Sequence, residues 1–230
     1  HPTLRRQRQM CIRDSTGTLD GSKTHKWVLE GLFGDCERVT KTDDLIKEGY
    51  LSKFRIKVLL CDHAPQYFES YHDEMEYLVE HKGRNNLIKN LVNDLKGNTL
   101  VLFNYVEKHG EPLYELINNT IDPERKLFFV HGGTDVEDRE KVRQITETES
   151  NAIIVASYGT FSTGINIKRL HNIIFASPSK SRIRNLQSIG RVLRKGEGKD
   201  MAILYDIADD IGGQNYTCLL YTSDAADEVL

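Results

Sequence analysis

The stretch NAIIVAS, residues 151–157, decides the fold. Its interior is wholly apolar and rich in β-branched residues, without the polar alternation of a strand that faces water on one side. A strand of this kind is buried on both faces, which favours a parallel sheet covered by helices. Runs of similar character recur along the chain: FRIKVLL (54–60), TLVLFN (99–104), KLFFVHG (126–132), HNIIFAS (171–177) and MAILYDI (201–207).

Segments with helical periodicity separate these strands. We expect helices over five ranges: 66–81, 84–96, 105–118, 135–148 and 182–195. Strands that alternate with helices form right-handed βαβ units, because a parallel strand needs a crossover connection. The sequence therefore predicts an α/β fold: a doubly wound, mainly parallel sheet with helices on both faces.

Composition indicates a globular chain with one locally basic segment. The 230 residues are 39% hydrophobic and 28% charged, and no apolar run is long enough to span a membrane. The net charge of −3 argues against general attraction to nucleic acid, yet eight Lys or Arg and no acidic residue occur between Lys168 and Lys195. Such a segment indicates an edge that faces a polyanion, or alternatively a solvated basic surface.

The two ends of the chain share an unusual relation. The stretch RRQRQMCIRDS (5–15) back-translates to DNA whose reverse complement encodes CLLYTSDAADE (218–228). This DNA resembles a sequencing-library transposon adapter. We therefore interpret residues 1–15 and 218–230 as adapter-derived artefacts. Residues 16–217 are then expected to be a piece of a longer reading frame.

The cysteines and histidines show no metal-binding pattern. Cys36 and Cys61, the two cysteines outside the ends, have no CxxC spacing, so neither a disulfide framework nor a zinc site is predicted. A reducing cytosol fits this usage. His72, His81 and His109 are likewise not spaced as metal ligands, and we expect them to be surface or helix-capping residues.

Polar, glycine-bearing turns follow four of the predicted strands. They are Asn104, HGG (131–133), SYGTFSTGIN (157–166) and SPSKSR (177–182). Because the carboxyl ends of parallel strands meet at one edge of a sheet, these turns should lie together there. Hydroxyls and backbone amides of this kind contact nucleic-acid phosphates and sugars without reading sequence. The alternative is ordinary turn chemistry.

Several of these stretches carry a family resemblance. QSIGRVLR (187–194) matches Gln-x-x-Gly-Arg-x-x-Arg, the last motif of superfamily 2 helicases. ASYGTFSTGINI (156–167) resembles the preceding motif of that family, and TLVLFNYVEKHGEPL (99–113) resembles the motif that opens its second RecA-like domain. TGT (16–18) is similar to a short motif closing the first such domain. The residues of these motifs most resemble those of the phage UvsW-type recombination helicases, and the resemblance covers nearly all of residues 16–217.

The resemblance implies a role for the predicted helix 182–195. In these helicases ATP lies in the cleft between two RecA-like domains, and Arg191 and Arg194 would reach the γ-phosphate. A guanidinium suits this role because it donates paired hydrogen bonds and stays charged. Gln187 would support the nucleotide or the attacking water, and Gly190 would permit close approach. We expect the arginine pair near the carboxyl edge of the sheet. The alternative is a pair of surface arginines bound to neighbouring acids.

Further residues take roles by the same resemblance. The cofactor-binding set is completed by Gly164, Asn166, Gly17 and Thr18. The nucleic-acid-binding set is Asn104, His131, Gly132, Ser157, Thr163, Lys180 and Arg182. Two positions depart from the common family pattern. Asn166 stands where Asp is frequent and so lacks the charge, and Ser157 stands where Thr is frequent but keeps the hydroxyl.

The implied organisation is a partial motor. Residues 16–50 would be a remnant of the first RecA-like domain with a linker, and 51–217 the second RecA-like, or helicase C-terminal, domain. The sequence holds no G-x-x-x-x-G-K-[ST] loop and no Asp-Glu-x-His motif. We therefore expect ATP and Mg²⁺ to be bound mainly by the first RecA-like domain of the parent chain, and the fragment alone to be inactive.

The implied function is that of an ATP-dependent DNA helicase acting in recombination or replication by unwinding or branch migration. It would work in the cytoplasm of a bacterium or a phage host, and a preference for DNA over RNA is left open. Two alternatives remain: a double-stranded DNA translocase subunit of a restriction enzyme, and a non-catalytic nucleic-acid-binding module.

Overall fold

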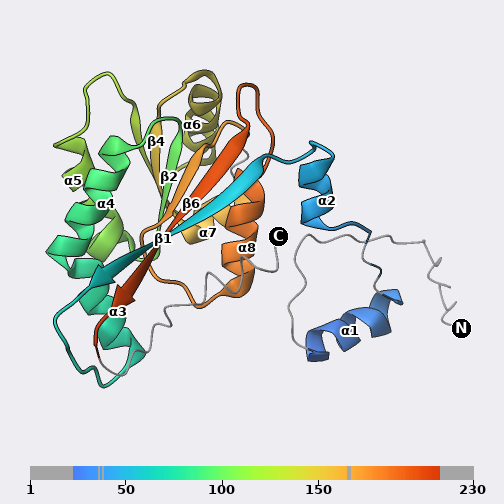
Figure 1. Cartoon of the computed structure of the whole chain (residues 1–230), viewed down its shortest axis with the longest axis horizontal. Helices are drawn as coiled ribbons and strands as arrows, with labels where there is room; N and C mark the ends of the chain where they lie inside the picture. Colours follow the sequence, from blue (N-terminus) through green and yellow to red (C-terminus); the bar gives the residue numbers. More distant parts are fainter. Residues whose placement is uncertain (1–22, 36, 38, 165–166, 213–230) are drawn as a thin grey trace, which may run out of the picture.

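A six-stranded sheet forms the centre of the protein (Figure 1). The computed structural model describes residues 23–35, 37, 39–164 and 167–212. Within this part of the chain the strands pair in the order β1-β6-β5-β2-β4-β3, and all neighbours are parallel. Their bounds are β1 (Lys53–Asp62), β2 (Thr99–Phe103), β3 (Leu127–Val130), β4 (Ile153–Ser157), β5 (Asn172–Phe175) and β6 (Met201–Asp210). The predicted parallel sheet is confirmed.

Helices follow the strands along the chain. Those after β1 are α3 (Tyr71–Glu80), α4 (Lys82–Asp94), α5 (Glu111–Asn118), α6 (Val136–Thr148), α7 (Tyr158–Gly164) and α8 (Arg182–Val192). A π-helical turn, η1 (Val106–Gly110), leads into α5, and α1 (Lys23–Phe33) and α2 (Thr42–Lys47) precede the sheet. The linker expected within residues 16–50 therefore contains a short helix, α2.

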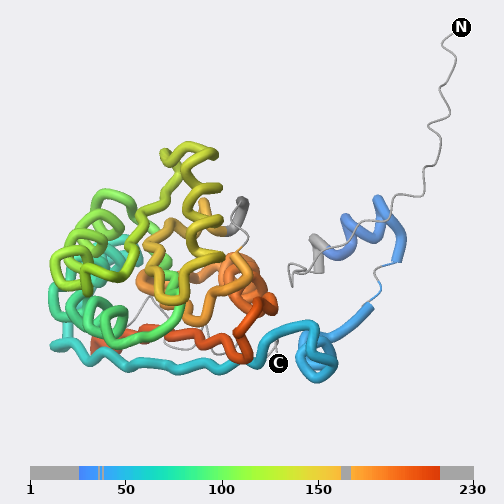
Figure 2. The backbone as a smooth tube through the Cα atoms, turned by 90° about the horizontal axis from the view of Figure 1, so that it is seen from above, coloured from blue at the N-terminus to red at the C-terminus, as the bar shows by residue number. Residues whose placement is uncertain are grey.

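A hydrophobic layer covers each of the two faces of the sheet. In Figure 2 green segments lie on one side and yellow and orange segments on the other. On one face Ile88 of α4 and Leu113 of α5 pack against the strands. On the other, Phe161 of α7 and Ile189 of α8 do so. The side chains of β2 are all buried, as its unbroken apolar run predicts. The helices lie on both faces as expected for a doubly wound fold.

Two helical segments differ from the prediction. Residues 158–164, expected as part of a turn, form α7, because Tyr158 and Phe161 bury their rings in the core. Residues 106–110 lie within the predicted helix 105–118 but form the π-helical turn η1, in which the Gly110 N–H donates to the Tyr105 carbonyl at 2.8 Å. A Cβ at Gly110 would lie 2.5 Å from the Phe103 ring, so glycine allows this turn to pack directly on β2.

The chain reaches the sheet at the end of α8. Leu51, just before β1, forms an antiparallel bridge with Arg194, and the Ser52 N–H donates to the Leu193 carbonyl at 2.9 Å. The Lys195 ammonium also donates to the Gly49 carbonyl at 3.0 Å. These contacts tie the segment after α2 to the residues that directly follow α8. Among the described helices, none has the length and apolar character needed to cross a membrane.

Candidate functional site

The turns predicted to gather at one edge of the sheet do so. Asn104, His131 and Ser177 follow β2, β3 and β5, and Ser157 is the last residue of β4. Phe103 lies opposite Ser157 in the parallel register, so neighbouring strands end at the same level. We call the segments that follow these four strands the carboxyl-edge loops.

Asn104 links two of the carboxyl-edge loops. Its side-chain amide donates to the Pro178 carbonyl at 3.1 Å, and its backbone N–H donates to the Ser177 hydroxyl at 3.1 Å. The Arg184 guanidinium donates to the Asn104 side-chain oxygen at 3.5 Å. Asn104 is half-buried, so its main function in the described structure is to hold the loop after β5 beside the loop after β2.

A basic surface surrounds the start of α8. Lys180, Arg182 and Arg184 are all exposed. The Ser181 hydroxyl accepts from the Arg184 N–H at 3.4 Å and so caps the helix. The Lys180 ammonium lies 4.1 Å from the centroid of the Tyr71 ring, a cation–π contact that holds it at this edge. Three cations beside a helix N-terminus form a positive surface suited to phosphate.

Ser157 caps α7. Its hydroxyl lies 2.8 Å from the Thr160 hydroxyl and accepts from the Thr160 N–H at 3.4 Å. The hydroxyl is half-buried and already bonded within the protein. Thr163 and Gly164 lie in the last turn of α7. The structure describes the helix there but not the surroundings of these two residues. Three further predicted residues fall outside the described residues: Gly17, Thr18 and Asn166.

His131 and Gly132 form a tight turn after β3. The Gly133 N–H donates to His131 Nδ1 at 3.2 Å, and the His131 N–H donates to the Thr134 hydroxyl at 3.0 Å. Gly132 is exposed, and no atom lies within 4 Å of a Cβ placed on it. Arg139 donates to its carbonyl at 3.3 Å. The turn lies on the predicted edge, but its imidazole acceptor is used within the turn itself.

Arg191 and Arg194, which are predicted to face the nucleotide, lie at the opposite edge of the sheet. Helix α8 begins beside the carboxyl-edge loops and extends about 16 Å for its eleven residues. Leu193 and Arg194, which directly follow it, contact Ser52 and Leu51. Both of these residues precede the parallel strand β1 and therefore lie at the amino edge. The expectation that Arg191 and Arg194 lie near the carboxyl edge is wrong, because α8 crosses the whole sheet before presenting them.

Arg191 and Arg194 are close to each other and partly buried. Burial, and then the nearby Arg194 guanidinium, lower the pKa of Arg191. The Arg191 guanidinium lies 5.8 Å from the centroid of the Phe161 ring on α7, so the two helices meet at this point. Gln187 and Gly190 are exposed on the same helix, and no atom lies within 4 Å of a Cβ placed on Gly190.

A buried lysine closes the end of α8. Lys199 is 1% exposed, and its ammonium donates to the carbonyls of Val192, Arg194 and Lys168, the last two at 3.0 and 3.4 Å. Burial lowers the pKa of Lys199 to about 8. Lys168 follows the α7 segment, so this one side chain joins it to the helix end that carries Arg194. Sequence reasoning missed Lys199, although a lysine after a helix end is a common carbonyl cap.

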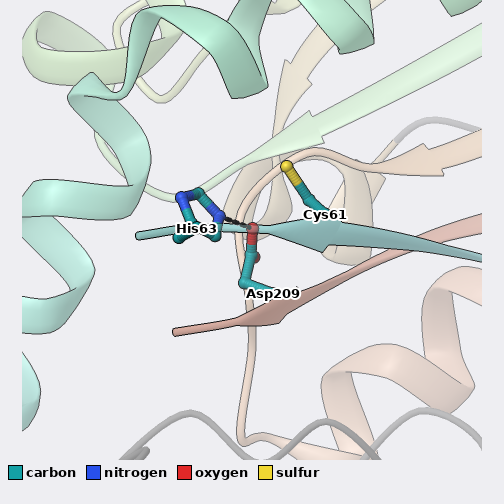
Figure 3. Close-up of side chains that lie close together, drawn as sticks. All are labelled: Cys61, His63 and Asp209. Atoms are coloured by element: carbon teal, nitrogen blue, oxygen red, sulfur yellow. Dashed lines mark hydrogen bonds and ion pairs between the residues drawn. The ribbon is translucent and has the colours of Figure 1, made fainter. Parts of the chain in front are cut away.

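Cys61, His63 and Asp209 form a cluster at the ends of β1 and β6 (Figure 3). Their potential ligand atoms lie within 4.8 Å of one another. However, His63 Nε2 lies 2.9 Å from Asp209, and the Arg84 Nε–H donates to both Asp209 oxygens at 2.9 and 3.0 Å. The carboxylate is already neutralised by a buried guanidinium, so we interpret the cluster as part of a polar network rather than a metal site.

Comparison with protein-family models matches residues 83–196 to the helicase conserved C-terminal domain. The matched segment contains β2 to β5 and α8, and therefore both the carboxyl-edge loops and the arginine pair.

Comparison with known proteins gives one relative in sequence and two solved structures of similar fold. The ATP-dependent DNA helicase uvsW of Enterobacteria phage T4 is 33% identical over 205 residues, which are 86% of this chain and 40% of that protein. The crystal structure of T4 UvsW matches with a TM-score of 0.59 and 30% identity, over 78% of this chain and 39% of that one. A DNA-bound ATP-dependent Type ISP restriction-modification enzyme, LlaBIII, matches in fold with a TM-score of 0.61 at 18% identity, over 87% and 15%. The chain thus spans less than half the length of each.

Proposed function

The chain contains a superfamily 2 helicase C-terminal domain with a RecA-like fold, and from that premise we propose that it is the second motor lobe of an ATP-dependent DNA helicase. In this proposal residues 51–217 form the second RecA-like domain, and 16–50 belong to a linker and to the end of the first. The parent protein would unwind or branch-migrate DNA in recombination or replication, in the cytoplasm of a bacterium or phage host.

Helix α8 is the observation that carries this proposal. Its first turn lies in the basic surface formed by Lys180, Arg182 and Arg184. Arg191 in its last turn and Arg194, two residues beyond its end, lie at the other edge of the sheet. A motor lobe needs two separate surfaces, one for a nucleic-acid backbone and one for a nucleotide. A helix with cations at both ends supplies the two surfaces on one rigid element.

The nucleotide surface is assigned to the amino edge. Arg191 and Arg194 would contact the γ-phosphate, with Gln187, Gly190, Gly164 and Asn166 nearby. The chain segment before β1 packs on the end of α8, so a preceding lobe joined through it would adjoin the arginines. That first lobe, with Gly17 and Thr18 at its end, would supply the phosphate loop and the Mg²⁺ site. ATP hydrolysis would then open and close the cleft between lobes.

The nucleic-acid surface is assigned to the carboxyl-edge loops. Exposed Lys180 and Arg182 would neutralise phosphates, while Asn104, His131, Gly132, Ser157 and Thr163 would contribute turns and hydroxyl or amide groups. Contacts of this kind go to the backbone, so binding should be independent of sequence and should weaken as salt rises. Such contacts suit DNA or RNA, and the UvsW resemblance favours DNA.

The test uses a protein that carries both lobes. Arg191→Ala should lower the ATP hydrolysis rate by about 10³-fold, because an arginine that stabilises phosphoryl-transfer charge contributes on that scale. Lys195→Ala is the matched control: Lys195 is exposed beside Arg194, and its loss should leave hydrolysis nearly unchanged. Unaltered hydrolysis in Arg191→Ala would refute the nucleotide assignment. The 230-residue chain alone should show no ATP turnover.

A second variant separates the two surfaces. The pair Lys180→Ala and Arg184→Ala should weaken DNA binding and DNA-stimulated hydrolysis, while hydrolysis without DNA remains. An equal loss of ATP hydrolysis with and without DNA would contradict the assignment of two distinct surfaces.

One rival function is a double-stranded DNA translocase subunit of a restriction enzyme. The restriction-modification enzyme LlaBIII shares the fold at 18% identity, so the fold is compatible with this function as well as with a helicase. A strand-displacement assay on the two-lobe protein distinguishes them, since a translocase hydrolyses ATP on duplex DNA without releasing a strand. The other rival, a non-catalytic binding module, predicts DNA binding with no ATP hydrolysis at all.

A further inference from the structure

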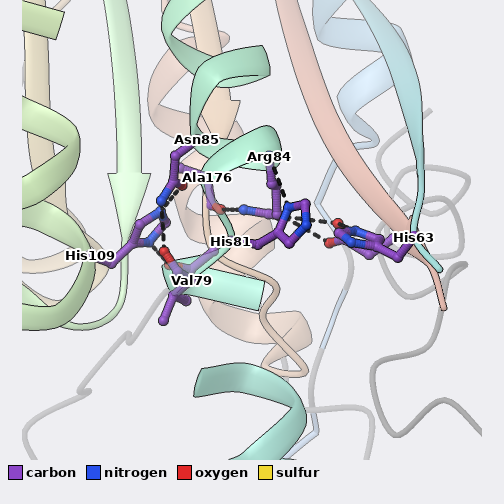
Figure 4. A network of polar contacts seen from close by, with 9 residues as sticks. His63, Val79, His81, Arg84, Asn85, His109 and Ala176 are labelled. Carbon is purple, nitrogen blue, oxygen red and sulfur yellow. Dashed lines mark hydrogen bonds and ion pairs between the residues drawn. The ribbon is translucent and has the colours of Figure 1, made fainter. Parts of the chain in front are cut away.

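A buried chain of hydrogen bonds lies beneath the carboxyl-edge loops (Figure 4). Its centre is His109, which is fully buried in the π-helical turn η1. The expectation that His109 is a surface or capping residue is therefore wrong. The imidazole bridges Asn85 of α4 and Ser177 of the loop after β5, with Nε2 at 3.1 Å and Nδ1 at 2.8 Å from their oxygens.

The direction of each hydrogen bond follows from the protonation state of His109. Burial, followed by the nearby Arg84 charge, lowers the pKa of His109 to about 3, so the ring is neutral and has one donor and one acceptor. The Asn85 amide donates to the Val79 carbonyl at 2.8 Å, which turns its oxygen toward His109. Nε2 therefore carries the proton, and Nδ1 accepts from the Ser177 hydroxyl.

The same hydroxyl continues the chain to the surface. Ser177 Oγ accepts the backbone N–H of Asn104 at 3.1 Å, and thereby fixes the loop after β2. The Ser177 carbonyl accepts from the Tyr158 hydroxyl at 3.3 Å, and the Ala176 carbonyl accepts from Arg84. Residues 176–177 are thus held from α4, η1, α7 and the end of β2. Three residues further on, Lys180 is exposed at the proposed nucleic-acid surface.

We propose that His109 is a positioning residue for nucleic-acid binding: through the Ser177 hydroxyl it locks the loops after β2 and β5 into one rigid unit that presents Asn104 and Lys180 to a phosphate backbone. The inference rests on the proposed function of the carboxyl-edge loops. It assigns no contact between His109 and the nucleic acid. A π-helical turn fits this role, because such turns are often retained where a side chain must be aimed at a functional site.

Two substitutions of His109 separate its two hydrogen bonds. An asparagine amide reaches the position of Nδ1, so His109→Asn keeps an acceptor for Ser177 and loses the bond to Asn85. A glutamine amide reaches the position of Nε2, so His109→Gln keeps the bond to Asn85 and loses the acceptor for Ser177. Ser177→Ala removes the shared hydroxyl with a minimal change of volume. Affinity is measured with the 230-residue chain and a fluorescein-labelled single-stranded DNA by anisotropy, and folding by thermal unfolding.

The proposal expects His109→Gln and Ser177→Ala each to weaken DNA binding by about tenfold, the effect of one lost hydrogen bond. The double variant should bind no more weakly than either single variant, because both changes break the same link. His109→Asn should bind within about twofold of the wild type, since its link to Ser177 remains.

Three other outcomes overturn the proposal. Folded His109→Gln and Ser177→Ala that both bind like the wild type would show that the link does not position the loops. If His109→Asn and His109→Gln lose the same affinity, in proportion to their lower thermal midpoints, His109 would have a role in stability alone. A wild-type chain that binds no DNA at low salt would refute the proposed nucleic-acid surface itself, and the positioning role with it.

Discussion

Replacing Lys199 with methionine should change how the stability of the protein depends on pH. The Lys199 ammonium is 1% exposed and donates to carbonyls of Val192, Arg194 and Lys168. Burial lowers its pKa from 10.5 to about 8. Methionine keeps an apolar stem of similar length without the charge. The difference in unfolding free energy between wild type and Lys199→Met therefore isolates this ammonium.

The sign follows from proton binding in the two states. Between pH 8 and 10.5 the unfolded chain holds the Lys199 proton and the folded protein has released it. Because the unfolded state binds more protons, the wild type gains stability relative to Lys199→Met as pH rises through this window. The interval between the two pKa values corresponds to about 3 kcal/mol, at roughly 1.4 kcal/mol for each pH unit. This contribution is complete above pH 10.5 and is lost as pH falls through about 8.

Urea unfolding followed by circular dichroism, at several pH values from about 7.5 to about 10.5, measures the difference. Tyrosine and cysteine titrations occur in both proteins and cancel in the subtraction. Lys195→Met is the matched control, because Lys195 lies at the same helix end but is exposed, and its profile should parallel the wild type. A free-energy difference for Lys199→Met that stays constant across the window would refute the reasoning.

Three further predictions concern buried groups. Gly110→Ala should destabilise the fold by about 1–3 kcal/mol in urea unfolding, because its Cβ would meet the Phe103 ring at 2.5 Å; a neutral effect would contradict the packing of η1. Asn98→Ala should lower the unfolding free energy by about 3 kcal/mol, since three backbone hydrogen bonds of this buried amide are lost, whereas exposed Asn119→Ala should have little effect. Burial raises the pKa of Asp206 to about 7, so the folded state holds a proton that the unfolded state releases above pH 3.8. Asp206→Asn should therefore gain stability relative to wild type as pH rises from about 4 to about 7, and a flat profile would count against a buried carboxyl there.

The sheet could be predicted from sequence because its strands are short, apolar and buried on both faces. All six predicted strands lie within or beside the observed ones, and the carboxyl-edge turns gather as expected. The local sequence pattern could not predict the secondary structure where tertiary contacts decide the conformation. Residues 158–164 have the composition of a turn, yet they form a helix because Phe161 packs into the core.

The roles of the candidate site residues stay predictions, and their arrangement could not be predicted from the sequence. A helix motif gives the spacing of Gln187, Arg191 and Arg194, but not the edge of the sheet at which the helix ends. The supporting residues His109 and Lys199 were missed because each acts through burial and through partners far away in sequence. A histidine or lysine has the same appearance in a sequence whether it is exposed or fully buried.

The anchoring of α8 at both ends has a mechanical consequence. Ser181 caps its beginning and Lys199 closes its end, so the helix has no joint between the surface proposed for DNA and the surface proposed for ATP. The DNA-binding surface and the ATP-binding surface would then be held in a fixed relative position by one rigid helix. When this lobe rotates, its contacts to DNA and to ATP would move together. The rate of the ATP hydrolysis cycle would then depend on the hinge between the two lobes.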